Sequence, residues 1–134
     1  MVAELAVHLR RRGWWLACAE SCTGGGVAAA LTELAGSSAW FECAYVTYSN
    51  RAKREMLGVS EQTLARHGAV SRETVLEMAT GALLRSHAQL SVAVSGIAGP
   101  GGGTPEKPVG TVWFAWATRE TSVADCRVFS GDRV

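Results

Sequence analysis

The sequence has no marked excess of charge, no long apolar run and no visible secretory signal. Its formal net charge is +1 over 134 residues, which gives no reason to expect nucleic acid or an anionic membrane as a partner. A local pocket for a small anionic ligand is still compatible with that balance. No stretch approaches the roughly 20 apolar residues that cross a bilayer, and the segment 1–12 lacks the apolar core of a signal peptide. We therefore expect a cytoplasmic protein.

Clustered metal ligands are also missing. No CxxC pair occurs among the four cysteines, and the three histidines are isolated, without ligand spacing. We therefore expect no metal site and interpret the cysteines as buried free thiols in a reducing compartment. Cys22 alone lacks an apolar, strand-like surrounding. The residues concerned are Cys18, Cys22, Cys43 and Cys126, and His8, His67 and His87.

The common nucleotide motifs are absent as well. The glycine-rich segment 20–26 has no lysine after its last glycine, so it is not a phosphate-binding P-loop. Its glycines also lack the GxGxxG spacing of a dinucleotide-binding turn.

What is present predicts an α/β protein. The length suits one domain with its own core, and helical and strand-like patterns alternate along the chain. We expect a single compact domain over residues 1–134, with a mixed sheet flanked by helices and closed by a hairpin. Strands are expected over residues 14–19, 41–49, 90–95, 109–117 and 123–129. Helices are expected over 2–12 and 27–34 and after the caps Asn50, Ser60 and Ser71.

The last residues look like the start of one more element. Gly131, Asp132 and Arg133 follow the final predicted strand, and Asp132 is a candidate helix cap. We expect that a final helix is missing here.

The turn at 20–26 is the first candidate site. It joins a predicted strand to a predicted helix, where unpaired amides and the helix dipole favour an anion and where α/β folds bind ligands. Ser21 is a candidate nucleophile there. The alternative is that Ser21 or Thr23 only caps the helix.

The loop at 96–108 is the second candidate. It holds all three prolines and five of the fifteen glycines, so no regular element can cross it. The amides of Gly101, Gly102 and Gly103 could cradle a phosphate or carboxylate, with Thr104 and Lys107 adding a hydroxyl and a charge. The alternative is a surface loop without a ligand.

The segment Tyr48–Lys53 is the third candidate. A lysine whose pKa is lowered can activate a serine, but the pattern alone favours an exposed helix lysine at Lys53. Glu20 is equally ambiguous, because a buried carboxylate needs a partner and an exposed one means little. The five tryptophans are expected in the core, with base stacking as an unsupported alternative. They are Trp14, Trp15, Trp40, Trp113 and Trp116.

Five segments in order give the chain a family resemblance that covers almost its whole length. They are Ala19-Glu20-Ser21-Cys22-Thr23-Gly24-Gly25, Tyr48-Ser49-Asn50 with Lys53, Leu57-Gly58-Val59, Gly68-Ala69-Val70-Ser71, and Ser95-Gly96-Ile97-Ala98-Gly99-Pro100 running on to Gly110-Thr111-Val112. The chain resembles the C-terminal domain of the CinA family.

The resemblance implies an amidohydrolase. Family members hydrolyse the carboxamide of nicotinamide mononucleotide to nicotinic acid mononucleotide and ammonia, which recycles pyridine nucleotides. It implies no metal or organic cofactor, and a homodimer. Ser21 would be the nucleophile and Lys53 its base, with Glu20, Thr23 and Tyr48 orienting the reacting group or the nicotinamide. Substrate-binding residues would be Cys22, Gly24, Gly25 and Ser95, and, for the ribose phosphate, Gly101, Gly102, Gly103 and Thr104. Backbone amides of residues 22–24 would stabilise the oxyanion.

Two alternatives stay open. The family continues past Gly-Asp-Arg into a helix with a further arginine, so this chain could be a weakened module that binds a pyridine nucleotide without turnover. A competence- or damage-inducible accessory role rests on the family name alone.

Overall fold

The computed structural model describes residues 2–130. Its centre is a five-stranded sheet with the order β2-β1-β3-β4-β5. The strands β2, β1 and β3 run parallel, β4 is antiparallel to β3, and β5 is antiparallel to β4. The predicted α/β class, mixed sheet and closing hairpin are therefore confirmed. The strands are β1 (Leu16–Glu20), β2 (Phe41–Val46), β3 (Leu90–Gly96), β4 (Thr111–Ala117) and β5 (Ser122–Val128).

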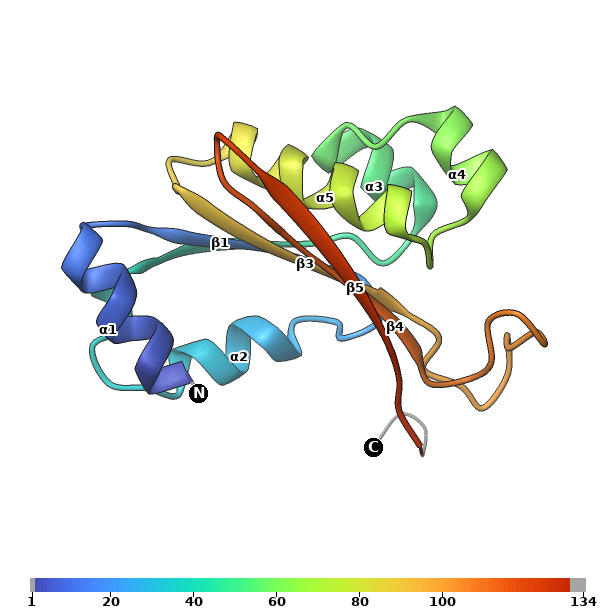
Figure 1. The fold of residues 1–134 in the computed structure, drawn as a ribbon, viewed down its shortest axis with the longest axis horizontal. Helices are drawn as coiled ribbons and strands as arrows, with labels where there is room; N and C mark the ends of the chain where they lie inside the picture. Colours follow the sequence, from blue (N-terminus) through green and yellow to red (C-terminus); the bar gives the residue numbers. More distant parts are fainter. Residues whose placement is uncertain (1, 131–134) are drawn as a thin grey trace.

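Helices cover both faces of the sheet. In Figure 1, α1 and α2 lie on one face, and α3, α4 and α5 lie on the other. None of the helices within residues 2–130 is both long and apolar enough to span a bilayer. The helices are α1 (Val2–Arg12), α2 (Gly26–Thr32), the 3-10 turn η1 (Ser37–Ala39), α3 (Asn50–Leu57), α4 (Glu61–His67) and α5 (Arg72–Arg85).

Serine caps start the three helices of the second face. The Ser60 and Ser71 hydroxyls accept from the Thr63 and Thr74 amides, as predicted. The cap predicted at Asn50 is wrong by one residue: Ser49 accepts from the amide of Ala52 at 3.0 Å, and Asn50 is already helical. Both are good caps, and the extended backbone of Ser49 decides between them.

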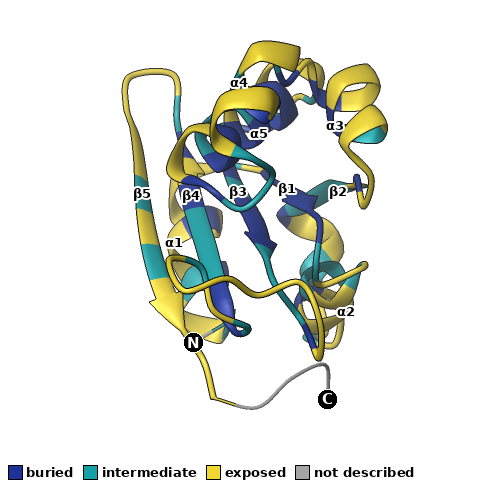
Figure 2. Ribbon diagram, turned by 90° about the vertical axis from the view of Figure 1, so that its right-hand side faces the viewer, coloured by how far each residue is buried: buried dark blue, intermediate teal, exposed yellow. Residues whose placement is uncertain are grey.

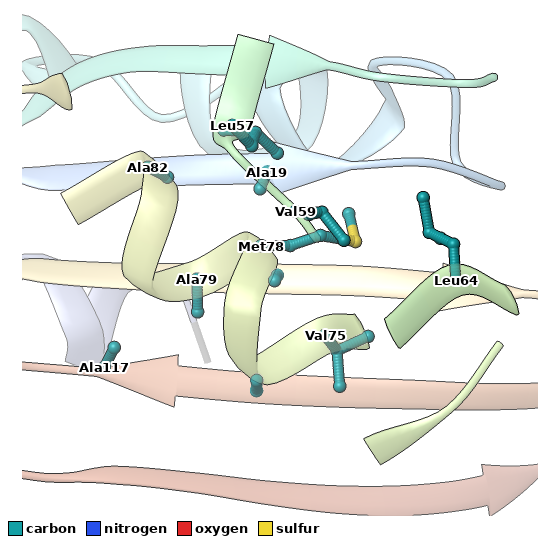
Figure 3. Close-up of a cluster of buried hydrophobic side chains, with 11 residues drawn as sticks. Ala19, Leu57, Val59, Leu64, Val75, Met78, Ala79, Ala82 and Ala117 are labelled. Carbon is teal, nitrogen blue, oxygen red and sulfur yellow. The ribbon is translucent and has the colours of Figure 1, made fainter. Parts of the chain in front are cut away.

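A hydrophobic core lies between α5 and the sheet (Figure 3). Burying each large side chain in it stabilises the fold by roughly 1.5–3 kcal/mol. A second core lies under α1 and α2, around Leu9, Leu16, Leu31 and Trp40. The first core is made of Ala19, Leu57, Val59, Leu64, Val75, Met78, Ala79, Ala82, Ala93, Ala115 and Ala117.

Strand β1 is buried over its whole length, because helices cover both of its faces. Figure 2 shows this strand in the buried colour, whereas β5 at the sheet edge is mostly exposed. The expectation that all tryptophans are in the core is wrong in part. Trp40 is fully buried, but Trp15 is 37% exposed and Trp116 is 39% exposed. Likewise Cys18 is buried, whereas Cys43 and Cys126 are only half-buried.

The chain order brings two connections together beside the end of β1. The connection from β1 to β2 runs through α2 on one face, and the connection from β2 to β3 runs through α3, α4 and α5 on the other. Adjacent parallel strands whose connections leave on opposite faces form the usual ligand site of open α/β sheets. The segments 21–25 and 47–53 meet at this point. The predicted element at Gly131, Asp132 and Arg133 lies outside the described residues.

Candidate active site

A serine and a lysine from distant segments form the centre of the site. Lys53 Nζ lies 2.8 Å from Ser21 Oγ, and both residues are buried, with 0% and 6% of their surfaces exposed. Ser21 follows β1 directly, and Lys53 is the fourth residue of α3. The lysine that its local pattern placed on an exposed helix face is therefore buried against the candidate nucleophile.

Two backbone carbonyls hold the lysine amine in place. Its Nζ donates to the Thr47 oxygen at 2.8 Å and to the Tyr48 oxygen at 3.2 Å. A neutral amine has two N–H groups and one lone pair. With both N–H groups engaged by carbonyls, the lone pair is left for the hydroxyl proton of Ser21. This arrangement suits a general base.

The electrostatics of the site agree with that geometry. Burial lowers the pKa of Lys53 from 10.5 to about 8, because the charged ammonium loses its hydration, while negative charge on the nearby Cys22 sulfur opposes this shift. The neutral amine is thus accessible near physiological pH. Burial also raises the pKa of the Cys22 thiol, which disfavours a thiolate nucleophile and leaves Ser21 as the activated one.

Glu20 points to the opposite face, although it precedes Ser21 directly. Its carboxylate is fully buried and accepts from the amides of Val27 at 3.0 Å and Ala28 at 2.8 Å, at the start of α2. The amide of Gly25 and the hydroxyl of Thr23 donate to it as well. The carboxylate therefore occupies the helix N-terminus that could otherwise bind an anion.

In the turn after Ser21, only some of the backbone amides are available to bind a ligand. The amide of Gly24 donates to the Ser21 carbonyl at 3.1 Å, and that of Gly25 goes to Glu20. Within residues 2–130, no acceptor is bonded to the amide of Thr23. The Cys22 amide contacts its own sulfur. Of the amides predicted for an oxyanion, those of Cys22 and Thr23 are thus free of any other residue.

The remaining predicted residues lie around this centre in different ways. The Tyr48 side chain is 59% exposed, beside the carbonyl that holds Lys53. Ser95 is buried on β3, next to β1 in the sheet. Gly101, Gly102, Gly103 and Thr104 are exposed in the loop after β3. The structure thus brings together Ser21, Lys53 and the Tyr48 backbone. Within residues 2–130, no hydrogen bond links these three residues to the glycine loop.

The glycine loop is tied to the rest of the molecule by Lys107. The side chain of Lys107 donates to the His67 carbonyl at 2.8 Å, at the end of α4. The Thr104 hydroxyl accepts from the Lys107 amide at 3.0 Å. The first contact ties the loop to the end of α4, and the second is internal to the loop.

One residue that positions the site, Gly81, was not predicted from the sequence. A Cβ atom on Gly81 would overlap the carbonyl of Leu57, so only glycine lets α5 approach α3 this closely. Since α3 carries Lys53, this approach helps to set where the amine lies. A glycine inside an otherwise regular helical pattern is the signal that could have indicated it.

Metal ligands do not gather in the described part of the chain: residues 2–130 contain no group of three or more histidine, cysteine, aspartate or glutamate side chains placed to hold an ion.

Comparison with known protein families establishes the family to which the chain belongs. The model of the CinA C-terminal domain matches residues 1–134. The chain belongs to this family. This CinA C-terminal domain is 60% identical over 131 residues to the protein from Escherichia coli K12 named nicotinamide-nucleotide amidohydrolase PncC, covering 97% of this chain and 79% of that protein. It is 53% identical over 133 residues to the protein of the same name from Pseudomonas putida, covering 99% of this chain and 83% of that protein.

A solved structure shares the fold. The competence/damage inducible protein CihA from Agrobacterium tumefaciens superposes with a TM-score of 0.93 at 50% identity, covering 96% of this chain and 79% of that one. The predicted membership of the CinA C-terminal domain family is confirmed.

Proposed function

We propose that this CinA C-terminal domain hydrolyses the carboxamide of nicotinamide mononucleotide to nicotinic acid mononucleotide and ammonia. The observation that carries the proposal is the buried contact of 2.8 Å between Lys53 Nζ and Ser21 Oγ. The names of relatives at 53–60% identity support the choice of substrate.

In the proposed first step, Ser21 Oγ bonds to the carboxamide carbon and its proton passes to Lys53 Nζ. The carbon–nitrogen bond then breaks as the nitrogen takes that proton, so ammonia leaves and an ester to Ser21 is left. Water hydrolyses the ester, with Lys53 accepting a proton from the water and returning one to Ser21. The products are the free acid and the regenerated pair.

The oxyanion that forms on the carbonyl oxygen would be stabilised by the amides of Cys22 and Thr23. Among residues 2–130, no other residue accepts a hydrogen bond from these two amides. Preorganised backbone donors are worth roughly 10²–10³ in rate. Glu20 and the Thr23 hydroxyl would orient the reacting group indirectly, because their hydrogen bonds fix the turn that presents Ser21.

The rest of the nucleotide would bind on the open side of the pair. The exposed Tyr48 ring offers a surface for the pyridine ring. The amides of residues 101–104 suit the phosphate, since exposed glycine amides can approach an anion closely.

The decisive experiment measures ammonia released from nicotinamide mononucleotide by the purified chain and by Ser21→Ala. Release by the wild type and none by the variant supports the reaction and the role of Ser21 together. Full turnover by Ser21→Ala would exclude serine as the nucleophile and make a bound water the attacker.

The same assay separates the enzyme from a binding module. If neither protein releases ammonia, a rise in melting temperature with added nicotinamide mononucleotide identifies a domain that binds without turnover, because a ligand of the folded state stabilises it.

Two further expectations belong to this proposal. The resemblance favours a homodimer, which light scattering of the purified chain would test. The free thiols suit the reducing cytoplasm, where the substrate is expected.

A further inference from the structure

Two buried side-chain polar atoms within residues 2–130 lack a hydrogen-bond partner: Trp40 Nε1 and Ser95 Oγ. Trp40 lies in the apolar core under α1 and α2. Ser95 is 1% exposed and lies beside the candidate active site. Leaving a buried hydroxyl unpaired costs roughly 1–3 kcal/mol, so the Ser95 hydroxyl calls for an explanation.

The strand register puts Ser95 next to Ser21. Ala19 of β1 is paired with Ala93 of β3, and both side chains lie in the core under α5. Side chains two residues apart point to the same face, so Ser21 and Ser95 face the side on which Lys53 lies. The Ser21 amide donates to the carbonyl of Val94 at 3.0 Å, which keeps the two segments adjacent.

A second serine on the same strand shows what a structural hydroxyl does here. Ser91 is fully buried and lies on the same face of β3, four residues before Ser95. Its hydroxyl donates to the Ala79 carbonyl at 2.6 Å. Ser95 has the same residue type, strand, face and burial, but within residues 2–130 it has no such partner.

We infer that the Ser95 hydroxyl accepts a hydrogen bond from the N–H of the substrate carboxamide and makes the site selective for a primary amide. The inference rests on the proposed function. A carboxamide brings two N–H donors into the site and needs acceptors for them. The carbonyls of Thr47 and Tyr48 are already engaged by Lys53, whereas Ser95 Oγ is unoccupied. A site built to bond a substrate N–H discriminates against analogues that lack it.

The test compares two substrates with Ser95→Ala. The amide is nicotinamide mononucleotide, and its analogue is the methyl ester of nicotinic acid mononucleotide, which has no N–H at the reacting centre. We expect kcat/KM for the amide to fall about tenfold, while kcat/KM for the ester stays within about twofold of the wild-type value. An equal loss on both substrates, or no loss on the amide, would overturn the inference.

Thermal unfolding gives a readout that is independent of activity. Ser95→Ala removes an unpaired hydroxyl, so its melting temperature should equal or exceed that of the wild type. The matched control Ser91→Ala removes a satisfied hydroxyl, so it should melt lower while keeping the wild-type ratio of amide to ester hydrolysis. If Ser95→Ala melts as low as Ser91→Ala, Ser95 has a structural partner and the inference is wrong.

If Ser95→Ala does not fold, Ser95→Cys replaces it, since the thiol has a similar size but is a weak acceptor. The same change in the amide-to-ester ratio is expected. Failure of the proposed function is seen separately, as wild-type protein that releases no ammonia and hydrolyses no ester.

Discussion

Glu20 and Ser21 are neighbours in the chain, yet they end up on opposite faces of the sheet with opposite consequences. On the α2 face, the Glu20 carboxylate receives three backbone amides and one hydroxyl. On the α3 face, Ser21 meets the amine of Lys53, and the hydroxyl of Ser95 has no partner among residues 2–130.

Both faces of the sheet bury polar groups, but only on the α2 face are the hydrogen bonds of the buried group all made within the protein. A buried charge whose hydrogen bonds are all made rigidifies the fold, and Glu20 does this for the turn and the start of α2. A buried amine that, once neutral, can direct its lone pair at a hydroxyl, beside a second hydroxyl without a partner, is suited to react with a ligand that enters the site. Burial alone therefore does not distinguish a structural polar residue from a reactive one. The number of donors and acceptors that have no hydrogen-bond partner does distinguish them.

The largest effect is expected from Lys53→Met. The variant keeps most of the length of the side chain but removes the base, so kcat should fall by about 1000-fold. Adding Ser21→Ala should slow it no further, because the two residues act as one unit. Ammonia release measures both, and Arg54→Met on the exposed side of α3 is the matched control. A loss of less than tenfold would exclude Lys53 as the base.

The pH dependence of the reaction tests the role of Lys53 on the α3 face further. With the pKa of Lys53 near 8, about 1% of the amine is neutral at pH 6, so kcat/KM there should be about 100-fold below its plateau. The rate should rise as pH increases through 8. A flat profile between pH 6 and 10 would contradict the general-base role.

The lowered pKa of Lys53 also predicts how the stability of the fold changes with pH. The lysine binds its proton more tightly in the unfolded chain, where its pKa is 10.5, than in the fold, where it is about 8. The free energy of unfolding should therefore rise with pH between about 8 and 10.5. Lys53→Met should remove this part of the rise.

The smallest of the four effects is expected on the other face, from Glu20→Gln. The amide group faces the Ala28 N–H with a donor in place of an acceptor, so the free energy of unfolding should fall by about 2 kcal/mol. For a domain of this size, that lowers the melting temperature by roughly 8 °C.

Thermal melting measures this loss, and Glu33→Gln on the exposed end of α2 is the control. The loss of activity in Glu20→Gln should be much smaller than in Lys53→Met. A drop in turnover as large as that of Lys53→Met, without loss of stability, would show that Glu20 takes part in the reaction directly.

The parts of the fold that were predicted correctly depend on short stretches of chain. The caps at Ser60 and Ser71 were found because a cap bonds an amide only three residues away. The strands around Leu16–Glu20 and Leu90–Gly96 were found because short apolar runs are typical of strands buried on both faces. Where two neighbouring residues are both good helix caps, the predicted cap was wrong by one residue, as with Asn50 in place of Ser49.

The candidate site was predicted in a different way. Ser21 was already a candidate nucleophile from its place in the turn between a strand and a helix. The family resemblance then gave Ser21, Lys53 and Tyr48 their roles, whereas the local pattern alone favoured an exposed Lys53. The importance of Gly81 was not predicted, because its contact with Leu57 exists only once α3 and α5 pack together.

The sequence by itself determined which elements form, where most of them begin and end, and which family the chain resembles, because those signals are local or are read directly from residues in order. Only the tertiary structure decided that Glu20 is saturated, that Lys53 is buried against Ser21 and that Ser95 is left unpaired. Ser21 and Lys53 are 32 residues apart, and no local rule brings them together. Their contact depends on the strand order, on the opposite crossovers of β1 and β2 and on the packing of α3 against α5.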